Sequence, residues 1–312
     1  MKKVKAWIAA ARLRTLPLSV SGIIVGGSLG NFYAQFHSPD VLHGICCPPV
    51  WKSSIFWLAI LTTIGFQILS NFANDYGDGV KGTDAHREGE KRMVASGAIS
   101  PKQMKIGMII TGIITLFIAS LLIFQAFGND NFLLSFVFFN LGIISIIAAV
   151  KYTVGESAYG YSGFGDLFVF MFFGILSVLG TYFLFTKTIH LDLLLPAASI
   201  GLFSTAVLNL NNMRDIENDA IVGKNTLVVK IGSKKAKNYH FVLLLFGMLA
   251  ALAYTYLHFE ETKQLLYTIS FLPLLWNIRT VFQNKIPSKL DSQLKIVALS
   301  TFLFAILFGW LH

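Results

Sequence analysis

Two stretches of the sequence, residues 71–84 and 209–224, each end a long apolar segment and carry oxygen-bearing side chains four residues apart. On a helix this spacing stacks the side chains on one face. Two such faces turned toward each other can bind Mg²⁺, which prefers carboxylate, amide and water oxygens and keeps positions open for the phosphates of a substrate. We therefore expect a Mg²⁺ cofactor with ligands from both stretches: Asn74, Asp78, Asn211, Asp215 and Asp219.

Acidic side chains in such positions also have a simpler explanation. A single acidic stretch after an apolar segment is usually a solvated loop, and an Asn near a helix end is often only a cap. Two such stretches weaken this explanation, because carboxylates at the edge of the hydrocarbon layer are costly and usually functional. Carboxylates brought together repel one another unless they are protonated or bound to a metal, and a divalent cation removes that repulsion.

Basic side chains near both stretches complete a site for a diphosphate. A diphosphate bridged by Mg²⁺ and held by cations is a good leaving group, because the charge that develops on it is neutralised. If it leaves an allylic carbon, the resulting carbocation needs a dry, aromatic-lined pocket and a nucleophile other than water. The basic candidates are Lys81, Lys91, Arg92, Lys151, Arg214, Lys224 and Lys230. The aromatic candidates, equally typical of lipid-facing or interfacial positions, are Tyr152, Tyr159, Tyr161, Phe164, Phe168 and Phe172.

The elements that must position these residues are membrane-spanning helices. The 312-residue chain is 54% hydrophobic and 13% charged, whereas soluble domains carry roughly a quarter charged residues. Its apolar segments are continuous rather than alternating, which favours helices over a membrane β-barrel. We predict an all-α, polytopic protein with nine spans, at about residues 15–36, 54–74, 104–127, 131–150, 165–186, 191–212, 239–258, 264–283 and 293–311.

The net charge of +9 indicates membrane topology rather than binding of nucleic acid. With nine spans, the N-terminus and the segments after even-numbered spans share one side of the membrane, and 22 of the 25 Lys and Arg residues fall there. By the positive-inside rule, that side and both acidic stretches face the cytoplasm. We expect a multi-pass protein of the bacterial inner membrane. The adjacent Cys46 and Cys47 have no predicted role.

The two stretches resemble the Asp-rich motifs of the UbiA family of intramembrane aromatic prenyltransferases. Residues 74–78 (Asn-Asp-x-x-Asp) match the first motif, and residues 212–227, with Arg214-Asp215-x-x-x-Asp219 and Gly223-Lys224, match the second. The segments similar to the menaquinone branch of the family are residues 11–17, 74–84, 94–97, 159–161 with 165–174, and 212–232. The first motif departs from the family's common form, because position 82 is Gly and the next acidic residue is Asp84, a shift that is usual in this branch.

This resemblance implies nine helices around a central cavity, with Mg²⁺ and no obligate protein partner. It implies transfer of a long-chain polyprenyl group from polyprenyl diphosphate to 1,4-dihydroxy-2-naphthoate, with loss of diphosphate and CO₂ to give demethylmenaquinol, while the prenyl tail leaves sideways into membrane lipid. It further implies Mg²⁺ ligands at Asn74, Asp78, Asp215 and Asp219, with Asp75 and Asp84 as further ligands or partners of Lys and Arg. Diphosphate contacts are implied for Arg12, Lys81, Arg92, Lys151, Arg214 and Lys224, and Tyr152 would face the carbocation or the naphthoate.

Three alternatives are open. Another member of the same family would use a different aromatic acceptor, as the haem, chlorophyll and 4-hydroxybenzoate prenyltransferases do. A CDP-alcohol phosphotransferase would carry one compact Asp-Gly-x-x-Ala-Arg signature, which this sequence lacks. A transporter would place ionisable groups near the middle of the membrane, and the predicted spans contain almost none.

The chain is expected to form one domain, residues 1–312. Four spans separate the two acidic motifs, which is compatible with a duplicated four-helix unit, residues 15–150 and 165–283, followed by a ninth helix. Periodicity alone does not decide whether such a duplication occurred.

Overall fold

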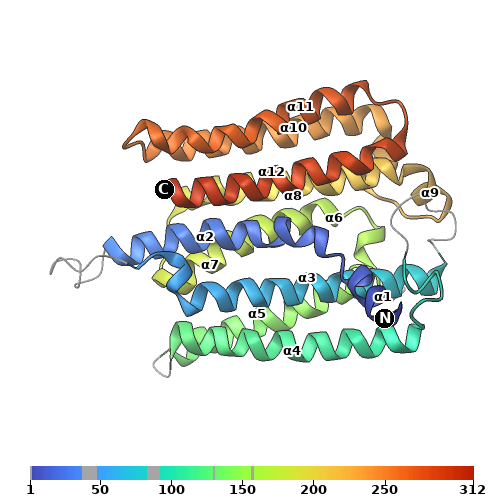
Figure 1. The fold of residues 1–312 in the computed structure, drawn as a ribbon, viewed down its shortest axis with the longest axis horizontal. Coiled ribbons are helices and arrows are strands. Elements are labelled where there is room, and N and C mark those ends of the chain that lie inside the picture. The colour runs from blue at the N-terminus through green and yellow to red at the C-terminus, as the bar shows by residue number, and fades with distance from the viewer. Residues whose placement is uncertain (1, 37–47, 83–91, 129–130, 156–157) are drawn as a thin grey trace.

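The computed structural model describes residues 2–36, 48–82, 92–128, 131–155 and 158–312. Within these ranges the chain contains helices and turns but no strand, and the long helices lie roughly parallel in one bundle (Figure 1). The predicted all-α fold is therefore confirmed. Four residues considered above, Cys46, Cys47, Asp84 and Lys91, lie outside the described ranges.

In the described part of the chain, nine helical segments are long and apolar enough to cross a membrane, as predicted. They are Lys3–Phe36, Ser54–Lys81, Pro101–Phe127, Phe132–Lys151, Gly165–Thr186, Leu191–Arg214, Leu227–Leu257, Thr262–Gln283 and Pro287–Leu311. The α-helices that build them are α1 (Lys2–Ala11), α2 (Leu16–Phe36), α3 (Ser54–Lys81), α4 (Pro101–Phe127), α5 (Phe132–Lys151), α6 (Gly165–Val169), α7 (Ser177–Thr186), α8 (Leu194–Arg214), α10 (Leu227–Leu257), α11 (Phe271–Gln283) and α12 (Asp291–Leu311). A short helix, α9 (Ile216–Ile221), follows α8, and a π-helical turn, Phe170–Leu176, joins α6 to α7.

Two helices extend beyond the limits that hydropathy predicts. Helix α3 continues from the expected end near residue 74 to Lys81, and Gly82 then ends it in the left-handed conformation, with φ of 73°. Helix α10 begins at residue 227 rather than near 239, and its backbone departs from helical geometry at Gly232. Hydropathy marks where the apolar surface ends, whereas backbone hydrogen bonding continues into the polar sequence beyond it. As a result, the whole first motif is helical.

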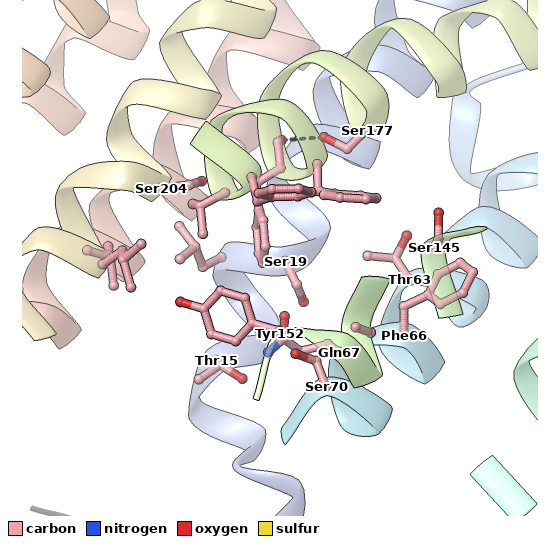
Figure 2. Close-up of a pocket in the computed structure, with 18 of the residues that line it drawn as sticks. Thr15, Ser19, Thr63, Phe66, Gln67, Ser70, Ser145, Tyr152, Ser177 and Ser204 are labelled. Atoms are coloured by element: carbon pink, nitrogen blue, oxygen red, sulfur yellow. Dashed lines mark hydrogen bonds between the residues drawn. The ribbon is translucent and has the colours of Figure 1, made fainter. Parts of the chain in front are cut away.

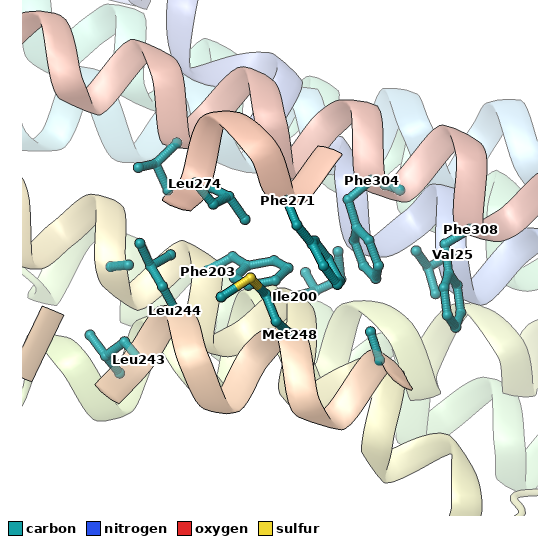
Figure 3. Close-up of a cluster of buried hydrophobic side chains, with 14 of the residues drawn as sticks. Val25, Ile200, Phe203, Leu243, Leu244, Met248, Phe271, Leu274, Phe304 and Phe308 are labelled. Atoms are coloured by element: carbon teal, nitrogen blue, oxygen red, sulfur yellow. The ribbon is translucent and has the colours of Figure 1, made fainter. Parts of the chain in front are cut away.

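Helix α8 lies at the centre of the larger apolar core. Its Phe203 is fully buried and meets Phe304 of α12 edge to face, with ring centroids 5.5 Å apart (Figure 3). Leu244 of α10 and Leu274 of α11 are also fully buried in this cluster. Large aromatic side chains contribute much of the contact area in such a core. Helix α8 is therefore held firmly, and so is the second motif at its end.

Small residues allow α2 and α7 to approach closely. Gly22, Gly26 and Gly30 recur every four residues along α2, a pattern typical of close helix packing in membranes. A Cβ atom at Gly26 would lie 2.2 Å from the Val178 carbonyl oxygen, and one at Gly30 would lie 3.0 Å from the Tyr182 Cα. Since both neighbours are backbone atoms, neither can rotate away.

We expect Gly26→Ala to lower the thermal stability of the detergent-solubilised protein, by about 1–3 kcal/mol of unfolding free energy, because the added methyl forces α2 and α7 apart. The matched control is Gly112→Ala on α4, where the nearest atom to a new Cβ is 3.9 Å away. Thermal unfolding of both variants measures the difference. Equal melting temperatures for the two variants would contradict this account of the packing.

Candidate active site

A cavity of about 680 Å³ lies inside the bundle, lined by residues of α2, α3, α4, α5, α7, α8, α12 and the π-helical turn (Figure 2). Its lining is polar where the two motifs end their helices and apolar farther along, where Ile23, Ala59, Leu122 and Leu184 line it. Among the predicted site residues, those that line it are Arg12, Asn74, Asp78, Arg92, Tyr152, Asn211 and Lys224. The fold thus brings both sequence motifs to one cavity.

In the first motif, Asp78 is buried and faces the cavity. One of its carboxylate oxygens accepts a hydrogen bond from Arg92 Nη2 at 2.9 Å, and the other accepts one from the Tyr161 hydroxyl at 2.5 Å. One turn earlier, the Asn74 side-chain oxygen accepts a hydrogen bond from Thr153 at 3.0 Å. Both oxygen-bearing side chains are therefore held in fixed orientations, as a binding site requires.

Asp75 serves a different purpose from its neighbours. Its two carboxylate oxygens accept the backbone N–H groups of Met93 and Val94, at 2.9 and 2.8 Å, and it does not line the cavity. Carboxylate acceptors form strong hydrogen bonds with backbone donors. This contact fixes the backbone at Met93 and Val94, and so it sets the position from which the preceding residue, Arg92, reaches Asp78.

In the second motif, Arg214 binds its neighbours by several hydrogen bonds. Its Nε and Nη2 atoms donate to the two carboxylate oxygens of Asp215, each at 2.7 Å, and Nη2 also donates to the Asn211 side-chain oxygen at 2.8 Å. Its Nη1 atom donates to Asp291 at 2.6 Å, at the start of α12. Arg214 was predicted to bind diphosphate, but in this structure it orients Asp215 and Asn211 and does not line the cavity.

Among the described residues, three of the four buried motif carboxylates, all but Asp75, have a cation close by. Arg92 pairs with Asp78 and Arg214 with Asp215, while Lys224 Nζ lies 3.7 Å from Asp219. Burying a carboxylate without such a partner would cost several kcal/mol. The backbone N–H of Asp219 also bonds to the Asp215 carbonyl, at 2.8 Å, so the turn between α8 and α9 keeps these two residues in helical succession.

The cavity-facing oxygen donors fit Mg²⁺ that arrives together with a diphosphate. Within the described ranges, no three His, Cys, Asp or Glu side chains are close enough to hold a metal on their own. Among the predicted metal ligands, those that line the cavity are Asp78, with its carboxylate, and Asn74 and Asn211, with their amides. Mg²⁺ commonly uses one or two carboxylates and completes its coordination with water and substrate phosphates.

Tyr161 connects the two motifs, a role that sequence analysis missed. Besides its hydrogen bond to Asp78, its ring lies 4.1 Å from Lys81 Nζ and 5.4 Å from Lys224 Nζ. Its backbone carbonyl accepts the N–H of Asn225 at 3.0 Å. A cation over an aromatic face is attracted by the ring's quadrupole. From the sequence, Tyr161 was only one of several aromatic candidates, and no pattern in the sequence indicated these contacts.

A series of aromatic rings forms one wall of the cavity. Ring centroids are 5.3 Å apart between Tyr152 and Tyr159, 4.1 Å between Tyr159 and Phe168, and 6.2 Å between Phe168 and Phe172. All four line the cavity, whereas Phe164 is 55% exposed and does not. Burial raises the pKa of Tyr159 to about 12, and burial together with the nearby Asp166 carboxylate raises the pKa of Tyr152. Both phenols are therefore neutral at physiological pH.

Several predicted residues lie away from the cavity lining. Lys151 is exposed at the end of α5, although the next two residues, Tyr152 and Thr153, both line the cavity. Lys81 covers the Tyr161 ring from outside the lining, and Asp215 and Asp219 are buried behind it. Cavity-lining residues that the sequence did not suggest include Arg14, Gln67, Ser70, Asp291 and Lys295.

Known proteins resemble this chain in sequence and in overall fold. The sequence profile of the UbiA prenyltransferase family matches residues 41–307. The 1,4-dihydroxy-2-naphthoate octaprenyltransferase of Haemophilus influenzae is 41% identical over 309 residues, which cover 99% of this chain and 96% of that protein. The protein of the same name from Escherichia coli is 43% identical over 255 residues, covering 81% and 77%. The solved structure of a UbiA homolog from Aeropyrum pernix K1 has the same fold, with a TM-score of 0.67 at 12% identity and coverage of 91% and 94%.

We expect Tyr161→Phe to weaken binding of Mg²⁺-pyrophosphate by about tenfold, because Asp78 loses a hydrogen-bond donor while the ring stays beneath Lys81. Tyr161→Leu should weaken it further, since the cation–π contacts are lost as well. Calorimetric titration of the solubilised protein measures both affinities. Tyr256→Phe, at a side chain that is 83% exposed on α10, is the control. Wild-type affinity in Tyr161→Phe would contradict the connecting role of this residue.

Proposed function

The chain belongs to the UbiA prenyltransferase family, and we propose that it transfers a long-chain polyprenyl group from its diphosphate to 1,4-dihydroxy-2-naphthoate, in menaquinone biosynthesis. The observation that carries this proposal is a cavity inside a bundle of membrane-spanning helices, whose polar end is lined by residues of both acidic motifs. The identity to relatives of that named activity, over nearly the whole chain in one case, supports the choice of acceptor.

The diphosphate binds at the polar end of the cavity. Mg²⁺, when bound with it, would be held by Asp78, Asn74 and Asn211 and would stabilise the negative charge on the leaving group. Arg92 and Lys224 line the same region and contribute positive charge to the leaving group, as does Arg12. Asp215 and Asp219 lie directly behind, so we propose that they act on the site through Arg214 and Lys224 or move toward the metal when the diphosphate enters.

The chemistry then proceeds in the dry part of the cavity. The bond between the prenyl C1 and the diphosphate oxygen breaks, and both electrons stay on the oxygen. A carbon of the naphthoate ring supplies the electron pair for the new carbon–carbon bond, and loss of the carboxyl group as CO₂ restores the aromatic ring. The wall from Tyr152 to Phe172 stabilises the allylic cation by its ring faces and keeps water away.

The prenyl tail occupies the apolar part of the cavity. Leu122, Ile123, Phe138, Leu141 and Leu184 line this part, on α4, α5 and α7. A long tail exceeds a volume of about 680 Å³, and so we propose that its far end passes between helices into lipid. Since 22 of 25 Lys and Arg residues lie on the motif side in the nine-span arrangement, we propose that this side faces the cytoplasm across the bacterial inner membrane.

We expect Asp78→Ala to lower kcat/KM by at least about 100-fold, because Arg92 would lose its partner and the metal a carboxylate ligand. Asp192→Ala is the matched control, since Asp192 pairs with His258 at 2.6 Å and does not line the cavity. Prenyl transfer in reconstituted vesicles measures both, with melting temperatures to establish folding. A folded Asp78→Ala protein with near wild-type turnover would refute the assignment.

The acceptor and the metal are tested together by a second measurement. Membranes containing the protein are incubated with labelled polyprenyl diphosphate and a panel of aromatic acids, with and without EDTA, and products are identified by mass. We expect a product only with 1,4-dihydroxy-2-naphthoate, at the mass expected after loss of CO₂, and none in EDTA until Mg²⁺ is restored. Product formation with 4-hydroxybenzoate alone would instead support another acceptor within the same family.

A further inference from the structure

One face of α3 carries an ordered series of polar side chains along the cavity. Gln67, Ser70, Asn74 and Asp78 follow one another at steps of three or four residues, and all four line the cavity. Figure 2 shows Gln67 and Ser70. Under the proposed function, Asp78 and Asn74 bind the diphosphate end. Gln67 then lies seven residues deeper than Asn74, about 10 Å along the helix axis. This separation is comparable to the length of a two-ring aromatic molecule.

A chain of hydrogen bonds fixes the orientation of the Gln67 amide. Asn71 donates through Nδ2 to the Ala11 carbonyl at 2.9 Å and to Thr15 Oγ1 at 3.2 Å. The Thr15 hydroxyl gives its own proton to the Arg12 carbonyl, so it is an acceptor toward Asn71. The Asn71 Oδ1 atom must therefore accept, and it receives a hydrogen bond from Gln67 Nε2 at 3.3 Å. The amide group of Gln67 cannot be reversed without breaking this chain.

The consequence is an available acceptor atom in the cavity wall. With Nε2 directed to Asn71, the Oε1 atom of Gln67 receives no hydrogen bond from any residue in the described ranges. A ligand that satisfies Oε1 must carry an O–H or N–H donor. A prenyl tail has neither, and an ionised diphosphate only accepts hydrogen bonds. The remaining substrate, the aromatic acceptor, is the molecule that meets this requirement.

The acceptor of the proposed reaction has two hydroxyl groups in different situations. The 1-hydroxyl lies beside the carboxylate and can bond to it within the molecule, as in salicylate. The 4-hydroxyl has no such neighbour and loses its hydrogen bond to water on entering the cavity. We propose that Gln67 Oε1 accepts a hydrogen bond from the 4-hydroxyl of the acceptor, and this inference rests on the proposed function.

Such a contact would serve both orientation and reactivity. It directs the 4-hydroxyl inward, so the ring lies between Gln67 and the diphosphate site at Asn74, at the depth where the prenyl C1 must be. An acceptor bonded to a phenolic hydrogen also shifts electron density onto the oxygen and into the ring, which favours attack on the allylic cation. Gln67 is thus a positioning and specificity residue for the dihydroxylated ring.

The test compares two ligands in two proteins. Dissociation constants for 1,4-dihydroxy-2-naphthoate and 1-hydroxy-2-naphthoate are measured by fluorescence under anaerobic conditions, with Mg²⁺ and pyrophosphate present, for the wild type and Gln67→Leu. We expect the wild type to prefer the dihydroxylated ligand by about five- to tenfold, and Gln67→Leu to bind both about equally. The matched control is Gln125→Leu at an exposed position of α4, which should keep the wild-type preference.

The outcomes separate this inference from the proposed function. Equal pyrophosphate affinity in wild type and Gln67→Leu establishes that the variant is folded; if it is not, Gln67→Asn, which shortens the side chain by one methylene, takes its place. Undiminished preference for the 4-hydroxyl in a folded variant overturns the inference, even when the wild type prenylates 1,4-dihydroxy-2-naphthoate. Failure of the wild type to prenylate that acceptor would overturn the proposed function instead.

Discussion

The burial of three carboxylates at the end of a membrane-spanning bundle is the constraint on which the rest of the site depends. Asp78, Asp215 and Asp219 are each less than 9% exposed, and a lone charge in such a place would be prohibitively costly. Each is accordingly next to a cation. Two of these cations, Arg92 and Lys224, line the cavity at its polar end and can also stabilise a diphosphate. When Mg²⁺ enters with a diphosphate, the metal would then pair with buried carboxylates and the cations with the diphosphate. No charge would be buried without a partner of opposite sign.

This constraint explains why residues without direct access to the cavity matter to it. Asp75 binds two backbone N–H groups and thereby places Arg92, while Arg214 binds Asp215, Asn211 and Asp291 at once. Tyr161 adds the contact between motifs that lie far apart in the sequence. A site of this kind keeps its geometry because supporting contacts hold each ligand, and loss of one support displaces the charges around it.

The sequence determined the number of spans and the meeting of the two motifs, because continuous apolar segments and i,i+4 spacing are local properties. It did not determine which side chains face the cavity. Successive residues on a helix point about 100° apart, so Lys151 is exposed while Tyr152, beside it, lines the cavity. Gln67 could not be predicted as a site residue, because one uncharged polar residue inside an apolar segment has little effect on hydropathy. Whether such a side chain faces the cavity is known only once the packing of the neighbouring helices is known.

The polar groups that line the cavity are weak nucleophiles, which favours reaction of the allylic cation with a carbon atom of the acceptor over reaction with an oxygen. Several hydroxyls that line it donate to carbonyls of their own helices, as Ser19 does to Leu16 and Ser145 to Leu141. The pKa values of Tyr152 and Tyr159 are raised, so these phenols stay protonated and weakly nucleophilic. The wall can therefore orient a polar ring without offering an ionised oxygen that would compete with it. An electron-rich ring held beside the prenyl C1 is then the most reactive partner within reach of the cation.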